Sequence, residues 1–136
     1  MQIDGRCLCG AITYEAVIDP SRAVICHCTD CQINSGSAFR FISAIRKEDF
    51  RLLTGNLKTY VKTAQSGAKR AQFFCPECGT QLYGADAADP QIFSLRLGTA
   101  RQIKQLAPSV QIWRRSALGW VSGIETRINF DAQPPV

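Results

Sequence analysis

The sequence lacks any apolar stretch that approaches the roughly 20 residues needed to cross a membrane as a helix. The segment from Met1 to Gly5 also lacks the basic and apolar regions of an export signal. The chain has an odd number of cysteines, seven, which could not all pair in disulfides. These features lead us to expect a cytoplasmic protein with reduced thiols and no membrane partner.

A dense stripe of basic residues is missing as well. The formal net charge is +5, but basic residues are adjacent only at Arg46 with Lys47, Lys69 with Arg70 and Arg114 with Arg115. A nucleic-acid-binding surface would normally show a denser basic cluster interleaved with aromatic residues. We therefore do not expect nucleic acid to be the main partner, whereas a mild positive field would attract small anionic substrates.

Helical patterns, internal repeats and low-complexity segments are scarce. The length of 136 residues suits one domain, which we expect to span residues 1–136. Short helices are predicted over residues 29–34, ending at Gly36, and over residues 47–53. Strands are predicted from alternating or β-branched residues over 12–18, 39–45, 57–63, 71–74, 80–83, 92–97 and 110–113. This pattern favours a mainly β fold, either a sandwich or two small sheets.

The cysteines, in contrast, form three short motifs. Cys75-Pro76-Glu77-Cys78-Gly79 is typical of a zinc knuckle, because two thiolates three residues apart can bind one metal and the glycine permits the turn. The alternative is a redox pair, which would need a different strand and helix context. Structural zinc takes four ligands, so we expect Cys7 and Cys9 to complete the site. The alternative for these two is a pair of buried apolar cysteines.

A second cluster, Cys26-His27-Cys28-Thr29-Asp30-Cys31, places three cysteines within six residues. Three thiolates can hold one zinc ion and leave a fourth position for substrate, as in catalytic sites. The alternatives are a closed site completed by His27 or Asp30, and a redox-sensing thiol cluster. His27 is the only histidine, and its side chain should point away from the metal. It could act as a hydrogen-bond donor, shuttle a proton or simply pack.

A zinc ion bound by three thiolates carries one net negative charge and is a weak Lewis acid. It is better suited to binding a soft ligand, such as a substrate thiolate, than to generating hydroxide. We therefore predict sulfur chemistry in which Cys26, Cys28 and Cys31 hold the catalytic zinc. Ser35 and Gly36 follow the cluster and are weaker candidates for substrate binding, since they could also simply end the short helix.

Together these motifs resemble the glutathione-dependent formaldehyde-activating enzyme family, which also includes the centromere protein V domain. The resemblance is carried by residues 5–15, 26–31, 35–36 and 74–80, with weaker landmarks at Leu97-Gly98-Thr99, Ile112-Trp113 and Trp120. It implies an Mss4-like fold of small antiparallel sheets with short helices, stapled by zinc.

The resemblance also implies two zinc ions per chain and a carbon–sulfur lyase reaction. The structural zinc would be bound by Cys7, Cys9, Cys75 and Cys78, and the catalytic zinc by Cys26, Cys28 and Cys31. The family's reaction joins glutathione and formaldehyde to give S-(hydroxymethyl)glutathione.

The chain departs from the family pattern at two places. Ala100-Arg101 follow Gly98-Thr99 where the family often has leucine and an acidic residue, and Gln111 replaces a common histidine. We therefore expect a small thiol adduct as substrate, with glutathione as one candidate. A non-catalytic zinc-stabilised binding module and a thiol or zinc redox sensor remain alternatives. A homodimer formed through exposed strand edges also remains open.

Overall fold

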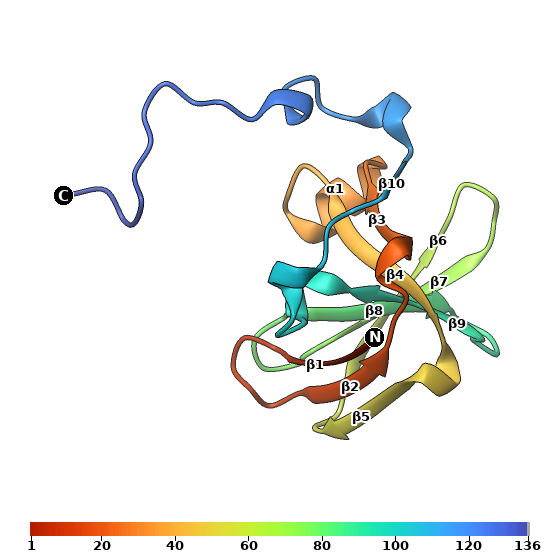
Figure 1. Cartoon of the computed structure of the whole chain (residues 1–136). Coiled ribbons are helices and arrows are strands. Elements are labelled where there is room, and N and C mark those ends of the chain that lie inside the picture. Colours follow the sequence, from red (N-terminus) through yellow and green to blue (C-terminus); the bar gives the residue numbers. More distant parts are fainter. Residues whose placement is uncertain (136) are drawn as a thin grey trace.

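The computed structural model describes residues 1–135; Val136, the last residue of the expected domain, lies outside the described residues. Two sheets form its body (Figure 1). The smaller sheet joins β1 (Gln2–Arg6), β2 (Thr13–Val17) and β5 (Phe50–Thr54) in antiparallel order. The larger has the order β10-β3-β4-β9-β8-β7-β6. In that order, its strands are Val110–Ile112, Ala23–Cys26, Arg40–Arg46, Ile92–Arg96, Gln81–Asp86, Lys69–Phe74 and Lys58–Thr63.

The predicted mainly β fold is confirmed, and each predicted strand overlaps a strand of the structure. Three strands, β1, β3 and β5, were not predicted. Neighbouring strands are antiparallel except at one edge, where β10 runs parallel to β3. The expected fold of antiparallel sheets thus includes one parallel pairing, at this edge.

Aromatic side chains connect the two sheets through one continuous core. Phe50 of β5 stacks on Tyr14 of β2 with ring centroids 5.3 Å apart, and it also forms T-shaped ring pairs with Tyr83 and Phe93. Tyr83 and Phe93, from β8 and β9, stack at 4.2 Å. Burial of these large rings supplies much of the hydrophobic stabilisation and fixes the smaller sheet on the larger one.

The helix predicted over residues 47–53 is wrong. Only Lys47–Asp49 forms a single 3-10 turn, after which Phe50–Thr54 becomes strand β5. The acidic and basic residues of this segment suit a helix locally, but the packing of Phe50 in the core and the pairing of β5 with β2 decide its conformation.

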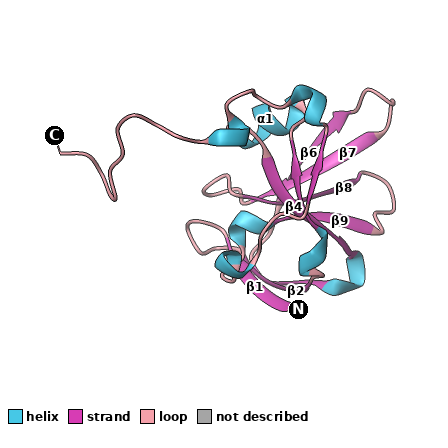
Figure 2. Cartoon of the chain, turned by 45° about the horizontal axis from the view of Figure 1, so that its top comes forward, coloured by secondary structure: helices cyan, strands magenta, loops and turns pink. Residues whose placement is uncertain are grey.

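The helix predicted over residues 29–34 is confirmed as α1 (Thr29–Ser35), the one α-helix of the described chain. Further 3-10 turns lie at Pro20–Arg22, Leu97–Thr99, Ile103–Gln105, Arg114–Ser116 and Val121–Gly123. After this last turn the chain extends away from the sheets, as Figures 1 and 2 both show. None of the helices described is long and apolar enough to span a membrane.

Candidate functional site

The structure brings Cys7, Cys9, Cys75 and Cys78 together from two loops. The first pair lies between β1 and β2, and the second lies between β7 and β8. Their sulfur atoms all lie within 4.8 Å of one another, with 3.6 Å from Cys7 to Cys9 and 3.8 Å from Cys9 to Cys75. Four sulfurs placed tetrahedrally about 2.3 Å from one ion would be about 3.8 Å apart. The donor set therefore fits a zinc ion, and the separations are far longer than the roughly 2 Å of a disulfide.

Backbone and hydroxyl groups orient these four sulfurs. The Ile12 N–H donates to Cys7 Sγ over 3.2 Å. Thr80 joins the two loops, because its Oγ1 accepts the Leu8 N–H at 3.0 Å and donates to Cys78 Sγ at 3.2 Å. Gly79 has a φ of 75°, which lets the chain turn after Cys78. Sequence reasoning did not assign a role to Thr80, because its two partners come from different loops.

Hydrogen bonds within this group separate the pKa values of its thiols. The Thr80 hydroxyl is the main cause that lowers the pKa of Cys78 to about 5. The Ala11 N–H lowers the pKa of Cys9, but the hydrogen bond with Cys7 and burial outweigh it and raise that pKa to about 12. Because a metal displaces the remaining thiol protons, metal binding at this group becomes stronger as pH rises.

The second group consists of Cys26, Cys28 and Cys31, whose sulfurs also lie within 4.8 Å of one another. Cys26 ends β3, Cys28 caps α1, and Cys31 lies in its first turn. The N–H of Cys31 donates to Cys28 Sγ over 3.3 Å, so the start of the helix orients this thiol. Three soft donors fit zinc and leave one tetrahedral position without a protein ligand from this group.

Neither alternative fourth ligand joins the three sulfurs. The Asp30 carboxylate forms an ion pair with Lys62 Nζ at 2.6 Å. His27 is 1% exposed, and its Nε2 lies 2.8 Å from Gln111 Oε1. Its ring also meets Phe39 edge-on, with centroids 6.0 Å apart. His27 is thus packed and hydrogen-bonded to strand β10, outside the group of sulfurs.

Ser35 and Gly36 end the helix that carries Cys31. Gly36 adopts a φ of 63° as the C-cap, and its N–H donates to the carbonyls of Gln32 and Ile33. The Ser35 hydroxyl lies 3.4 Å from the Phe39 carbonyl. Neither residue lines the cavities described below. Their role in substrate binding stays a prediction.

A cavity of about 490 Å³ lies against helix α1. It is lined by α1 and by strands β4, β6 and β7, with the residues Asp30, Ile33, Asn34, Arg40, Tyr60, Val61, Lys62, Thr63 and Gln72. Since Asp30 precedes Cys31 in α1, this cavity borders the helix that carries Cys31, but none of the three cysteines lines it.

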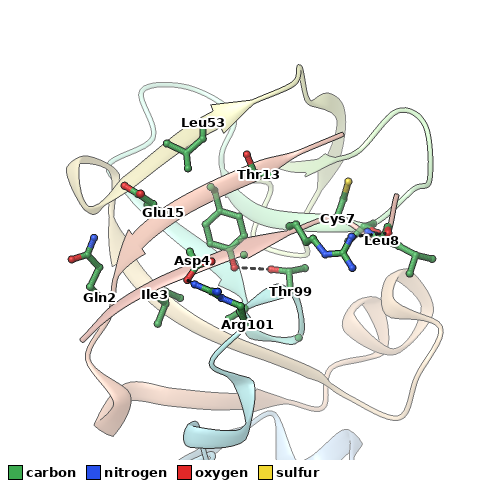
Figure 3. A pocket seen from close by; sticks show the side chains of 16 residues that line it. Gln2, Ile3, Asp4, Cys7, Leu8, Thr13, Glu15, Leu53, Thr99 and Arg101 are labelled. Carbon is green, nitrogen blue, oxygen red and sulfur yellow. Dashed lines mark hydrogen bonds and ion pairs between the residues drawn. The ribbon is translucent and has the colours of Figure 1, made fainter. Parts of the chain in front are cut away.

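A larger cavity, of about 910 Å³, lies over β1 and β2 and is shown in Figure 3. Cys7 and Leu8 lie toward one end, and its wall includes Ala100 and Arg101, the two residues that depart from the family pattern after Gly98-Thr99. None of Cys26, Cys28 and Cys31 lines it. Because Cys7 lines it, this cavity adjoins the four-cysteine group.

Residues 2–116 match the sequence profile of a family described as glutathione-dependent formaldehyde-activating enzyme. The chain is 34% identical over 84 residues to a Schizosaccharomyces pombe protein named as an uncharacterized lyase. This alignment covers 62% of the chain but only 58% of that relative. A crystal structure of a Rhodobacter sphaeroides protein has a TM-score of 0.62 at 20% identity, covering 79% of this chain and 98% of the other. At that identity, the likeness shows a shared fold.

Proposed function

The chain belongs to the glutathione-dependent formaldehyde-activating enzyme family, and from that premise we propose that it is a zinc-dependent carbon–sulfur lyase acting on a small thiol adduct. The observation that carries the proposal is the group of three sulfurs from Cys26, Cys28 and Cys31, within 4.8 Å of one another. This donor set suits zinc and leaves a place for a substrate atom. The resemblance to a protein named as a lyase supports the same reaction class.

We infer that zinc is bound by both cysteine groups, with a structural role at Cys7, Cys9, Cys75 and Cys78. At the three-cysteine group, zinc would supply one free coordination position for a soft donor such as a thiolate. A reducing compartment such as the cytoplasm would keep all seven thiols able to bind metal. The donor set favours making or breaking a carbon–sulfur bond over hydrolysis, because three thiolates leave the ion little Lewis acidity.

Hydrogen bonds of His27, Gln32 and Gln111 hold the segment from Cys26 to Cys31, the three-cysteine loop, in place. The His27 N–H donates to the Ile112 carbonyl at 3.1 Å, and the His27 ring is bound to Gln111. Gln32 Nε2 donates to the carbonyls of His27 and Ser116 over 2.8 and 2.9 Å. These contacts tie both ends of the loop to β10 and the turn after it. The sulfurs are therefore orientated before substrate arrives.

The proposed reaction makes or breaks one carbon–sulfur bond. In the forward direction the thiol sulfur attacks the aldehyde carbon, and the carbonyl oxygen takes up the proton that the thiol gives up. In reverse, the hydroxyl proton leaves, the carbonyl re-forms, and the sulfur keeps the electron pair of the broken bond. No oxidant or reductant is needed in either direction.

The test measures formaldehyde exchange between thiol adducts and free thiol by NMR, with the uncatalysed rate subtracted. We expect the zinc-loaded protein to accelerate exchange for at least one small thiol and Cys28→Ser to lose this acceleration while staying folded. Full activity in Cys28→Ser would rule out the three-sulfur site as the centre. A protein that binds both zinc ions yet accelerates no thiol adduct would overturn the lyase proposal.

A further inference from the structure

The last residues of the described chain form an arm of apolar composition. This C-terminal arm, residues 117–135, follows the turn Arg114–Ser116 and lies beyond residue 116, where the match to the family profile ends. Between residues 117 and 130 its only charged side chains are Glu125 and Arg127. Disordered tails are rich in charge and poor in aromatic and β-branched residues, so this composition indicates a segment that packs against another surface. The exposed large apolar residues of the arm are Leu118, Trp120, Ile124, Ile128 and Phe130.

The rest of the described chain leaves this arm uncovered. Its five large apolar side chains are between 40% and 70% exposed, and none of the described residues beyond Leu106 is buried. Residues 118–135 form hydrogen bonds only with one another within the described chain. Figures 1 and 2 show the arm projecting from the body in both views. Monomeric proteins rarely leave an apolar surface of this extent in water, so we look for a partner that covers it.

The arm leaves the body from a fixed root, residues 113–116. Trp113 has a φ of 57°, a left-handed conformation that is rare for a bulky residue and that ends strand β10. Its ring lies 4.7 Å from the Arg115 guanidinium carbon, measured from the ring centroid. The Ser116 carbonyl accepts a hydrogen bond from Gln32 Nε2 at 2.9 Å, which ties the root to α1. The arm therefore starts from a defined position on the body.

The body next to this root is also apolar and unpaired. β10 is an edge strand of the seven-stranded sheet, so one side of its backbone is free to meet another chain. Val110 and Ile112 of β10 are exposed, and so is Trp113 after them. An uncovered edge and an uncovered arm thus follow one another in residues 110–130 of every copy of the chain. This arrangement suits an isologous dimer, in which both copies use the same surface.

The apolar area of two arms matches the size of a stable interface. Each of the five side chains exposes roughly 100 Å² of apolar surface, since a fully covered aromatic side chain buries about 150–250 Å². Two arms and the surfaces that they cover would together remove about 2,000 Å² from water, and stable interfaces bury about 1,200–2,000 Å². The arms alone could therefore hold two copies together.

The charges of the arm favour a second copy of the chain over a membrane surface. Glu125 and Arg127 have opposite signs, and neither takes part in an ion pair within the described chain. Two arms therefore bring complementary charges to one interface. Membrane-surface helices are amphipathic with a basic face, whereas the described arm has a single 3-10 turn, Val121–Gly123, and no α-helix.

We propose that the chain forms a dimer with twofold symmetry, in which the C-terminal arm of each copy packs on the β10 edge and the arm root of the other. Trp120, Ile124, Ile128 and Phe130 supply the apolar contacts of the arm. This inference goes beyond the proposed function and does not depend on it, because none of the seven cysteines belongs to the arm or to β10.

The experiment measures the mass of the full zinc-loaded chain by sedimentation equilibrium, over concentrations from about 1 to 100 μM. We expect twice the chain mass of 15.0 kDa. The double variant Trp120→Ser with Phe130→Ser should weaken association at least about 100-fold, because buried aromatic residues dominate interfaces and each substitution is present twice in the dimer.

A matched control separates loss of the interface from loss of the fold. No arm residue belongs to the hydrophobic core, so the double variant should keep the β structure and zinc content of the native protein. Ile92→Ser is the control, since Ile92 is 49% exposed at the start of β9 and belongs to neither β10 nor the arm. It should sediment as a dimer.

Fluorescence distinguishes an arm that docks on a second copy from one that docks on its own chain. The chain has two tryptophans, so Trp113→Phe leaves Trp120 as the only one. We expect its emission to move to longer wavelength as dilution separates the dimer, because water then surrounds the ring. Emission at short wavelength that does not change on dilution would show the arm folded on its own chain and overturn the proposal.

The sedimentation results decide the proposal in the same way. A dimer that is lost in Trp120→Ser with Phe130→Ser and kept in Ile92→Ser would support it. A monomer over the whole concentration range would overturn it, and so would a dimer whose dissociation constant is the same in the native protein and the double variant.

Discussion

Gln111 Oε1 lies 2.8 Å from Nε2 of the buried His27, a contact between residues 84 positions apart. An amide oxygen can only accept, so Nε2 must carry the proton. The Nδ1 atom of the ring is buried without a partner among the described residues. Gln111 therefore provides the one hydrogen bond of the imidazole among the described residues. Because Gln111 lies in β10, this contact fastens the three-cysteine loop to that strand.

Substitution Gln111→Leu should destabilise the zinc-loaded protein by about 1–3 kcal/mol, because a buried ring N–H would lose its partner. Urea unfolding measures the change. Gln105→Leu is the matched control, since Gln105 is an exposed glutamine with no side-chain hydrogen bond in the described structure. Equal stability of the two variants would show that the His27–Gln111 contact contributes nothing.

Chelation should remove the two metals in separate steps. Elemental analysis is expected to find about two zinc ions per chain, falling to about one in Cys31→Ser without loss of β structure. A mild chelator should have the same effect, because the three-ligand site holds its ion with fewer bonds. Cys78→Ser should instead lower the melting temperature strongly, since its site joins two distant loops. One zinc ion in both the native protein and Cys31→Ser would mean that the three-cysteine group is empty.

Gly5→Ala should destabilise the protein by about 3 kcal/mol. A Cβ at Gly5 would lie 2.4 Å from the Tyr14 hydroxyl and 2.5 Å from the Thr99 carbonyl, and the second of these is backbone that cannot rotate away. Gly98→Ala provides the control, because a Cβ there meets no atom within 4 Å. Thermal unfolding of both variants measures the difference, and a harmless Gly5→Ala would contradict the close packing of β1 on the 97–99 turn.

Tyr14 should make the protein less stable at high pH. Burial raises the pKa of Tyr14 to about 12 from 10.0, although its hydrogen bond with Thr99 opposes the rise. The raised pKa stabilises the fold below pH 10, where the group is protonated in both states. That contribution is lost as pH rises from about 10 to about 12, and it amounts to about 2–3 kcal/mol in full.

The comparison with Tyr14→Phe isolates this effect, because other groups that titrate at high pH are common to both proteins. Urea unfolding at pH 8, 10 and 11 should show the difference in unfolding free energy shrinking or changing sign as pH rises. A difference that stays constant over this range would argue that Tyr14 ionises in the folded protein at its ordinary pKa.

The sequence predicted elements well where local pattern and packing agree. Strand β2 alternates buried Tyr14 and Ala16 with more exposed neighbours, and α1 has its stop signal at Gly36. Strand β1 was missed because Gly5 occupies a buried position without an apolar side chain. The segment after Lys47 was misassigned, because only the tertiary contacts of Phe50 convert it to a strand.

The two cysteine groups could be expected from spacing, since ligands close in sequence must bring their sulfurs together. The cavity beside α1 could not be expected from the sequence. Arg40, Lys62 and Gln72 come from three different strands, and nothing local in the sequence signals that they meet. Likewise, Gln111 was noted only as a departure from a family pattern, whereas its contact with His27 needs the parallel pairing of β10 with β3.

The two cysteine groups differ in how much of the chain must be synthesised before each group can assemble. Cys26 to Cys31 are neighbours in sequence, so a growing polypeptide presents this motif early and could capture an ion before it folds. Cys9 and Cys75 lie 66 positions apart, so the other group waits until the β7–β8 hairpin has been synthesised and has met the first loop. An ion that also binds the unfolded chain stabilises the fold less. With zinc bound at both groups as proposed, biosynthesis would take up the two ions at different stages.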